Sequence, residues 1–204
     1  SGDGISRHLE QCRDEIARTN PLLVSIAAGI RIKEILRWCK CDLAVIRVMP
    51  NTPALINAGV SGLFANSFTS ETQQQTAENI MQAVGPAVWV NSESDIDVVT
   101  GISGSGPAYF FRIMEIMIAA AIDKGLDRET ASTLVLNTAL GAARLASEGS
   151  LAPGELRRQV TSPGGTTEAA LAAMESNGLE QTVVRGIHAA IERSDELATQ
   201  LGEE

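Results

Sequence analysis

Residues 160–176 read VTSPGGTTEAALAAMES, a run of small and hydroxyl-bearing residues in front of an apolar helical segment. The proline and the two glycines end the preceding helix, and the next helix is expected to begin at about Thr167. Its first backbone amides, from Gly165 to Glu168, would have no acceptor within the helix and would lie at the positive end of the helix dipole. The side chains that add hydroxyl donors are those of Ser162, Thr166 and Thr167.

This segment is therefore expected to bind a small carboxylate or a phosphate. The simpler alternative is that Thr166 only caps its own helix. One hydroxyl group would suffice for a cap, whereas the segment offers three together with two glycines, and this surplus favours anion binding.

Two predicted strand ends carry small or polar residues. The stretch 21–29, PLLVSIAAG, is predicted to be a buried strand that ends in Ala27, Ala28 and Gly29. The stretch 43–50, LAVIRVMP, is predicted to be a second buried strand, followed by Asn51 and Thr52. Ligands of open α/β sheets bind beyond the carboxyl ends of the strands, so these residues predict a ligand crevice; close packing between helix and sheet is the alternative.

A second glycine-rich stretch, TGISGSGPAYFF (100–111), has the order G-x-x-G-x-G. It lacks the G-x-G-x-x-G order of a dinucleotide fingerprint, and no predicted strand precedes it. We interpret it as a tight bend packed between helices, with Pro107 in the first turn of the next helix.

The elements that position these residues change in kind along the chain. Up to about residue 91, strands alternate with helices, which predicts βαβ units and a parallel sheet. The helices expected there are 5–18, 30–39 and 71–84, the last with Ser70 as N-cap, and two further strands are expected at about 60–66 and 86–91. From residue 92 on, only helices are expected, at about 93–100, 107–124, 128–147, 153–160, 167–176 and 179–200.

The helix expected at 107–124 is apolar around most of its circumference. Such a helix has to be buried, and the helical half is too small to cover it alone. We therefore expect a homodimer in which helices of the two copies pack together.

Composition excludes several classes of protein. The formal net charge is −9, and no cluster of Lys and Arg is present to displace phosphate counterions, which argues against nucleic acid as a partner. The three cysteines, Cys12, Cys39 and Cys41, form no C-x-x-C, and the histidines His8 and His188 lie at opposite ends of the sequence, so no metal site is expected. No stretch reaches about 18 uninterrupted apolar residues and no signal-peptide core is present, which predicts a cytoplasmic protein without membrane association.

Four motifs occur in one order: SIAAG, RVMPNTPA, VTGISGSGPAYFF and VTSPGGTTEAALAAME. Together they resemble the pyrroline-5-carboxylate reductase family over nearly the whole chain, from about residue 20 onward. The resemblance implies reduction of 1-pyrroline-5-carboxylate to L-proline with NADPH or NADH, the last step of proline biosynthesis. It also implies an α/β plus all-α fold: a partial Rossmann-type parallel sheet over 1–92, then a helical dimerisation and substrate-binding domain over 93–204, with the active site completed across a homodimer or higher homo-oligomer.

The resemblance also assigns roles to individual residues. Thr167 would be the catalytic residue, near the ring nitrogen of the substrate. The residues implied to bind substrate are Glu93, Ser162, Gly165, Thr166 and Thr167, and those implied to contact the cofactor are Ile26, Ala27, Ala28 and Gln159. A cyclic imine is readily protonated in water, so positioning it against the cofactor is expected to supply most of the rate acceleration without a strong catalytic acid.

The chain departs from the family at its start. Family members begin with a strand and a G-x-G-x-x-G-type turn, and this first βαβ portion is expected to be missing here. That leaves two other readings: a truncated, non-catalytic dimerisation module that binds proline, and, less favoured because its motif holds no Lys or Arg, a phosphate-binding protein.

Overall fold

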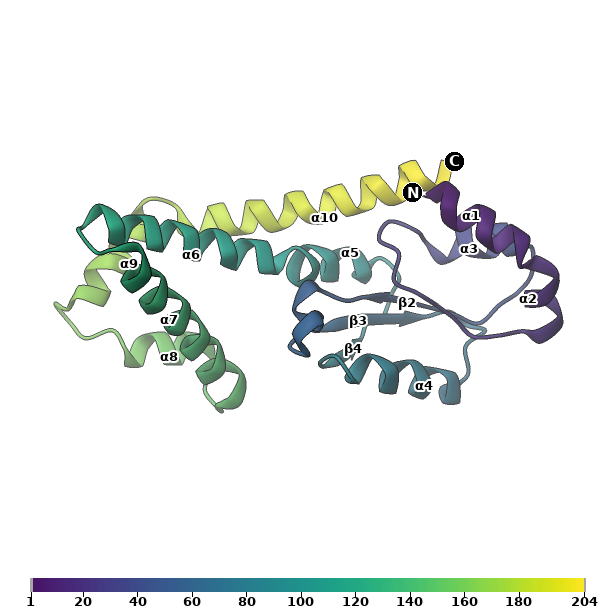
Figure 1. Ribbon diagram of the computed structural model, residues 1–204, viewed down its shortest axis with the longest axis horizontal. Helices are drawn as coiled ribbons and strands as arrows, with labels where there is room; N and C mark the ends of the chain where they lie inside the picture. The colour runs from purple at the N-terminus through teal and green to yellow at the C-terminus, as the bar shows by residue number, and fades with distance from the viewer. Residues whose placement is uncertain (1, 204) are drawn as a thin grey trace. The chain divides into compact units, whose positions relative to one another are not determined.

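Four short strands form one sheet in the order β1-β2-β3-β4 in the computed structural model, which describes residues 2–203 (Figure 1). The strands are β1 (Leu23–Ser25), β2 (Val45–Met49), β3 (Ser61–Ala65) and β4 (Ala87–Trp89). β1 pairs with β2 in parallel and β3 with β4 in parallel, but β2 and β3 are antiparallel. The prediction of an all-parallel sheet was therefore wrong at one pair. Only the 3-10 turn η1 (Thr52–Ile56) separates β2 from β3, and such a connection is too short for a parallel crossover, which needs a dozen or more residues, usually as a helix.

Helices cover both faces of this sheet (Figure 1). One core cluster joins α3 (Ile32–Cys39) to the strand residue Val45, with α1 (Gly2–Gln11) and α2 (Arg13–Thr19) packed alongside. The other cluster joins Ile46 and Val48 of β2 to α4 (Glu71–Gln82). Consecutive residues of β2 thus face opposite layers, as the period of two in a strand requires.

Two predictions about helices of the sheet unit can be compared with the structure. The helix predicted at 5–18 is divided into α1 and α2 at Cys12. The helix α4 (Glu71–Gln82) begins with a capping box in which Ser70 Oγ accepts from Gln73 N and Gln73 Oε1 accepts from Ser70 N. The predicted cap at Ser70 is confirmed.

The second glycine-rich stretch is helical, so the predicted tight bend was wrong. The short helix α5 (Asp95–Val99) runs into a π-helical segment, η2 (Thr100–Gly104), closed by a 2.8 Å hydrogen bond from Ser105 N to Thr100 O. Its glycines allow close packing: a Cβ on Gly101 would lie 2.5 Å from Ile191, and one on Gly104 would lie 2.6 Å from Met49. Pro107 does lie in the first turn of the following helix, α6 (Gly106–Asp123).

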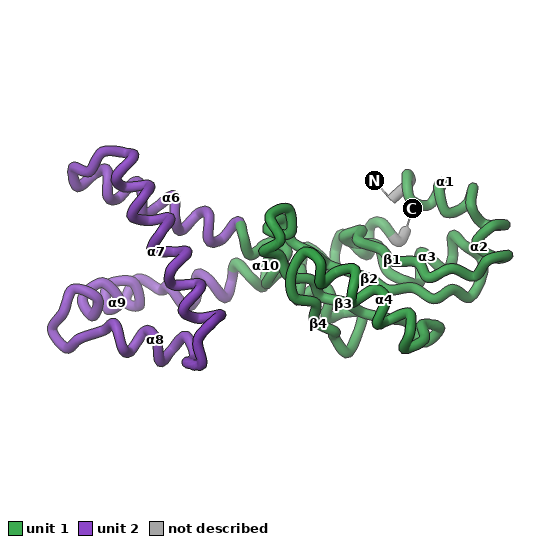
Figure 2. The backbone as a smooth tube through the Cα atoms, turned by 60° about the horizontal axis from the view of Figure 1, so that its bottom comes forward, with its two compact units in different colours: residues 1–107, 186–204 green, residues 108–185 purple. Residues whose placement is uncertain are grey.

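The chain divides into two compact units (Figure 2). One comprises residues up to 107 together with those from 186 on, and the other comprises 108–185. This division does not coincide with the boundary predicted between residues 92 and 93, because α5 packs on β2 and β3 and the end of the last helix returns to the sheet unit.

The second unit is all-helical. Its elements are the greater part of α6, α7 (Arg128–Glu148), α8 (Pro153–Gln159), α9 (Thr166–Ser176) and the beginning of α10 (Leu179–Glu203). Among its residues, all of which the structure describes, the buried hydrophobic side chains are only those of Ala131 and Val135. Large apolar side chains such as Phe110 (64% exposed) and Ile116 (51%) of α6 and Leu140 of α7 (58%) lie on the surface instead. One chain therefore does not cover the apolar faces of this unit.

One helical stretch among the described residues, Asp95–Asp123, is long and apolar enough to cross a membrane by length and composition alone. Those two criteria are weak evidence for a span, since apolar helices that pack against other protein surfaces meet them too. The length and the apolar composition of α6 satisfy them here.

Candidate functional site

The Pro-Gly-Gly segment forms a tight turn in front of α9. Gly165 N donates to Ser162 O at 3.0 Å, and Gly164 has a left-handed backbone with φ of +72°. The N-cap of α9 is Gly165, which makes no side-chain capping bond, and the helix begins at Thr166, one residue earlier than predicted. Thr166 is therefore the first helical residue, and the alternative that it only caps its own helix was wrong.

This helix start has the donors that an anion site needs. The first intrahelical bond of α9 runs from Ala169 N to Gly165 O, so the amides of residues 166–168 precede the point where acceptors become available. A Cβ placed on Gly164 would meet nothing within 4 Å, so the turn is open on that side. Ser162 and Thr166 are exposed and Thr167 is half-buried. The turn therefore brings together four of the predicted substrate residues, Ser162, Gly165, Thr166 and Thr167.

One negative charge already lies at this turn. Glu168 Oε2 accepts from Gly164 N at 2.7 Å. This contact satisfies the glycine amide and leaves those of residues 166–168 for a ligand. Gln159, predicted to contact the cofactor, is the exposed last residue of α8 in the same unit.

The predicted cofactor residues Ile26, Ala27 and Ala28 lie together in the sheet unit, directly after β1. Ile26 is 65% exposed and Ala28 is also exposed, while Ala27 N donates to Ser25 Oγ at 3.4 Å. A groove of about 410 Å³ lies beside them, lined mainly by apolar residues of α1, β1 and α3. No strand in the described part of the chain is followed by a G-x-G-x-x-G turn, so no pyrophosphate contact is assigned.

Glu93, the fifth predicted substrate residue, belongs to the sheet unit and is tied into its framework. Its Oε1 accepts from Ile32 N, the first amide of α3, at 2.7 Å and from Arg47 Nη1 at 3.0 Å. The Arg47 side chain is only 4% exposed, so Glu93 both caps a helix and balances a buried cation. Sequence reasoning missed Arg47, although an arginine inside the apolar strand LAVIRVMP signals a need for a carboxylate partner.

Asn51 has a structural role at the strand end where a polar ligand contact was expected. Its Nδ2 donates to Ser103 O at 3.1 Å, and its Oδ1 accepts from Val60 N at 3.0 Å. The carboxamide therefore braces the π-helical segment against the start of β3. Thr52 is exposed at the beginning of η1.

A third polar group, missed from the sequence, links segments far apart in the chain. Asp97 of α5 is buried and accepts from Arg31 Nη2 at 3.2 Å and from Ser194 Oγ at 2.7 Å. These partners are 66 and 97 residues away from it in sequence, so no local pattern could have identified them.

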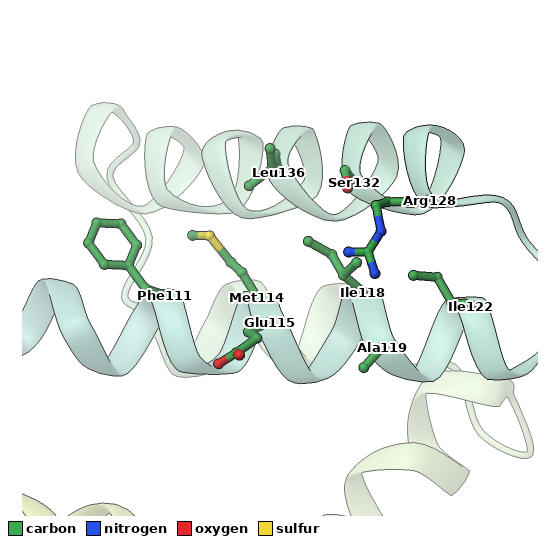
Figure 3. A pocket seen from close by; sticks show the side chains of 9 residues that line it. All are labelled: Phe111, Met114, Glu115, Ile118, Ala119, Ile122, Arg128, Ser132 and Leu136. Carbon is green, nitrogen blue, oxygen red and sulfur yellow. The ribbon is translucent and has the colours of Figure 1, made fainter.

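An apolar groove in the helical unit, about 440 Å³ in volume, lies between α6 and α7. Figure 3 shows Met114 and Ile118 of α6 pointing toward α7, with Leu136 of α7 opposite and Arg128 at one end. Within residues 2–203, no group of three or more His, Cys, Asp or Glu side chains is arranged to hold a metal ion.

The chain thus combines a sheet unit with an exposed strand end after β1 and a helical unit with an open helix start at α9. The sequence profile for pyrroline-5-carboxylate reductase dimerisation matches residues 93–197. The chain is 52% identical over 182 residues to pyrroline-5-carboxylate reductase of Pseudomonas aeruginosa, covering 89% of this chain and 67% of that protein. It is 43% identical to the enzyme of Haemophilus influenzae, with the same coverage of 89% and 67%.

Solved structures agree. A pyrroline-5-carboxylate reductase from Coxiella burnetii superposes with a TM-score of 0.91 at 43% identity, covering 95% of this chain and 72% of that one. The Plasmodium falciparum pyrroline carboxylate reductase, a structure with NADP bound, gives 0.87 at 29% identity, with 97% and 78% covered. The chain belongs to the pyrroline-5-carboxylate reductase family. This confirms the identification made from the four motifs and the α/β plus all-α fold, and it favours the oxidoreductase over the non-catalytic module.

Proposed function

We propose that the chain reduces 1-pyrroline-5-carboxylate to L-proline with NADPH or NADH, and that the turn before α9 holds the substrate carboxylate. The observation that carries the proposal is the open helix start, with three amides and the hydroxyl groups of Ser162, Thr166 and Thr167 on one turn. A helix N-terminus binds carboxylates through its unpaired N–H groups and its dipole. The family supplies a substrate that carries such a carboxylate.

The proposed reaction needs no strongly acidic or basic side chain. In the protonated imine the ring nitrogen already carries its proton, so addition of hydride to the adjacent carbon gives the amine of proline directly. Thr167 would orient the ring by accepting a hydrogen bond from the nitrogen, and the turn amides would hold the carboxylate. The reduced nicotinamide supplies the hydride when bound, and the residues that would hold it are Ile26, Ala27, Ala28 and Gln159. The protein's contribution is thus chiefly orientation.

Glu93 would contact the product, as the family resemblance implies. Its Oε1 is used by Ile32 and Arg47, which would leave Oε2 to face the ligand. The framework contacts would then fix the direction of the carboxylate.

The chain would act as a homodimer or a higher homo-oligomer. The support is the dimerisation profile over 93–197 together with the exposed apolar faces of α6 and α7. A second copy packed on these faces would bury side chains that one chain leaves in water. The free thiols of Cys12, Cys39 and Cys41 suit the reducing environment of the cytoplasm, which is the compartment we propose.

The test is oxidation of NADPH and NADH, followed by absorbance with 1-pyrroline-5-carboxylate, for the unmodified chain, Thr167→Ala and Thr167→Ser. The unmodified chain is expected to show turnover. Thr167→Ala is expected to weaken transition-state binding by about 1–3 kcal/mol, whereas Thr167→Ser is expected to retain most of the activity. Proline binding by calorimetry without any turnover would instead support the non-catalytic module. Full activity of Thr167→Ala would remove Thr167 from the site.

A further inference from the structure

The segment that follows β1 rests on the C-terminal part of α10. Gly29 has a left-handed backbone with φ of +74°, and a Cβ placed on it would lie 3.1 Å from Leu201 Cδ1 and 3.5 Å from Leu197 Cβ. A side chain at residue 29 would therefore be both strained and crowded. The glycine lets the backbone beside Ala28 approach α10 closely.

Packing fixes only part of this segment. Ala27 packs against the core cluster around α3, and Gly29 lies close to Leu197 and Leu201 of α10. Ala28 is exposed, and it lines a hollow of about 190 Å³ together with Ala190 and Leu197 of α10. Polar contacts supply further interactions that hold the segment in place.

Those interactions converge on one buried carboxylate. The Asp97 side chain is 6% exposed, and it accepts from Arg31 Nη2, at the end of the segment, and from Ser194 Oγ of α10. Arg31 also pairs with Asp195, the next residue of α10. Since hydrogen bonds to charged groups in a shielded site are the stronger ones, this network ties the segment, α5 and α10 together.

We infer that Ser194, Asp97 and Arg31 are positioning residues that hold the strand end Ile26–Ala28 in the conformation that contacts the cofactor. This inference rests on the cofactor role proposed above for Ile26–Ala28. None of the three residues needs to touch the cofactor. Their effect passes through the backbone of residues 29–31, and it makes α10 a support for cofactor binding.

The test compares Ser194→Ala, which removes the hydroxyl donor, with Ser194→Thr, which keeps it. Arg31→Gln removes the other anchor at a position where the side chain is 21% exposed, and serves if Ser194→Ala does not fold. The matched control is Glu196→Gln, because Glu196 lies on the same helix and pairs only with the exposed Arg193 at 2.8 Å among the contacts of the described chain. Each variant is measured as the full chain.

The first readout is hydrogen–deuterium exchange of the amides of residues 26–32 without cofactor. Ser194→Ala and Arg31→Gln are expected to raise their exchange rates by about tenfold, as loss of one charge-assisted hydrogen bond predicts, while Ser194→Thr and Glu196→Gln leave them unchanged. Unchanged exchange in both Ser194→Ala and Arg31→Gln, or a uniform rise over the whole sheet unit, would overturn the inference whatever the activity.

The second readout separates the inference from the proposed function. With 1-pyrroline-5-carboxylate saturating, the KM for NADPH is expected to rise about tenfold in Ser194→Ala, with kcat and proline affinity retained. An inactive unmodified chain would count against the proposed function and leave the exchange result to decide the role of the network. If the unmodified chain is active but Ser194→Ala leaves the KM for NADPH unchanged, the positioning role is overturned.

Discussion

The carboxylate of Glu168 accepts a hydrogen bond from the backbone amide of Gly164, at 2.7 Å, across the turn that we propose binds the substrate carboxylate. The contact joins the first turn of α9 to the loop in front of it and so shapes the site. It also places a negative charge beside a ligand of the same sign. Glu168 therefore favours ligand binding by shaping the turn and opposes it by its negative charge.

Glu168→Gln should separate these two effects, because glutamine keeps an oxygen acceptor for Gly164 and removes the charge. We expect proline to bind severalfold more tightly, in line with the up to about 1 kcal/mol that exposed charge pairs contribute. Calorimetric titration with proline measures this. Glu175→Gln, an exposed position near the other end of α9, is the control and should change nothing. Weaker binding by Glu168→Gln would mean that the charged form of the contact is needed to hold the turn.

Local patterns predicted most of the helices and strands. Ser70 as N-cap predicted the start of α4, and the Pro-Gly-Gly segment predicted the start of α9 to within one residue. Contacts between residues far apart in the sequence could not be predicted from local patterns. The direction of β3 against β2 depends on the length of one loop, and Asp97 finds its partners 66 and 97 residues away.

The same difference between local and long-range contacts decided which parts of the candidate site could be predicted. Residues next to one another in sequence, such as Thr166 and Thr167, could be assigned to one turn from the amino-acid order alone. The role of Glu93 as a helix cap and partner of Arg47 could not, because these contacts span 61 and 46 residues. The place of Asn51 after a strand suggested a ligand contact, but both ends of its carboxamide are used within the fold.

The Arg47–Glu93 pair should dominate the stability of the sheet unit. Glu93→Gln keeps an acceptor for Ile32 N but leaves Arg47, 4% exposed, without its anionic partner. Breaking a buried pair from one side costs about 3–5 kcal/mol, and urea unfolding should show a loss toward the lower end because Glu93 is 23% exposed. Arg47→Met combined with Glu93→Gln should be more stable than Glu93→Gln alone. A loss below about 1 kcal/mol for Glu93→Gln would show that water reaches Arg47.

Charge on the exposed apolar face of α6 should disrupt the proposed dimer. Ile116 is 51% exposed in one chain, and Ile116→Asp would put a carboxylate into an interface that should be apolar at its centre. We expect sedimentation to show a shift from dimer or larger species to monomer. The neighbouring Glu115→Asp keeps the charge at an exposed position of the same helix and should sediment as the unmodified chain does. A stable monomer of the unmodified chain would contradict the proposed assembly.

Asp127 should give the helical unit a stability that depends on pH. Its carboxylate caps α7 by accepting from Thr130 Oγ1 at 2.6 Å and from Thr130 N at 2.9 Å, and these hydrogen bonds lower the pKa of Asp127 below its ordinary value of 3.8. A carboxyl group whose pKa is lower in the folded state stabilises the fold above the unfolded pKa and loses that contribution as the pH falls through the folded one.

Asp127→Ala should therefore lower the Tm at neutral pH, and its difference from the unmodified chain should shrink below pH 3.8. Asp127→Asn still caps the helix but does not titrate, so the difference between it and Asp127→Ala should not vary with pH. Thermal unfolding by circular dichroism from pH 7 down to about pH 2.5 measures all three, and a difference between Asp127→Ala and the unmodified chain that stays constant in acid would contradict the assigned hydrogen bonds.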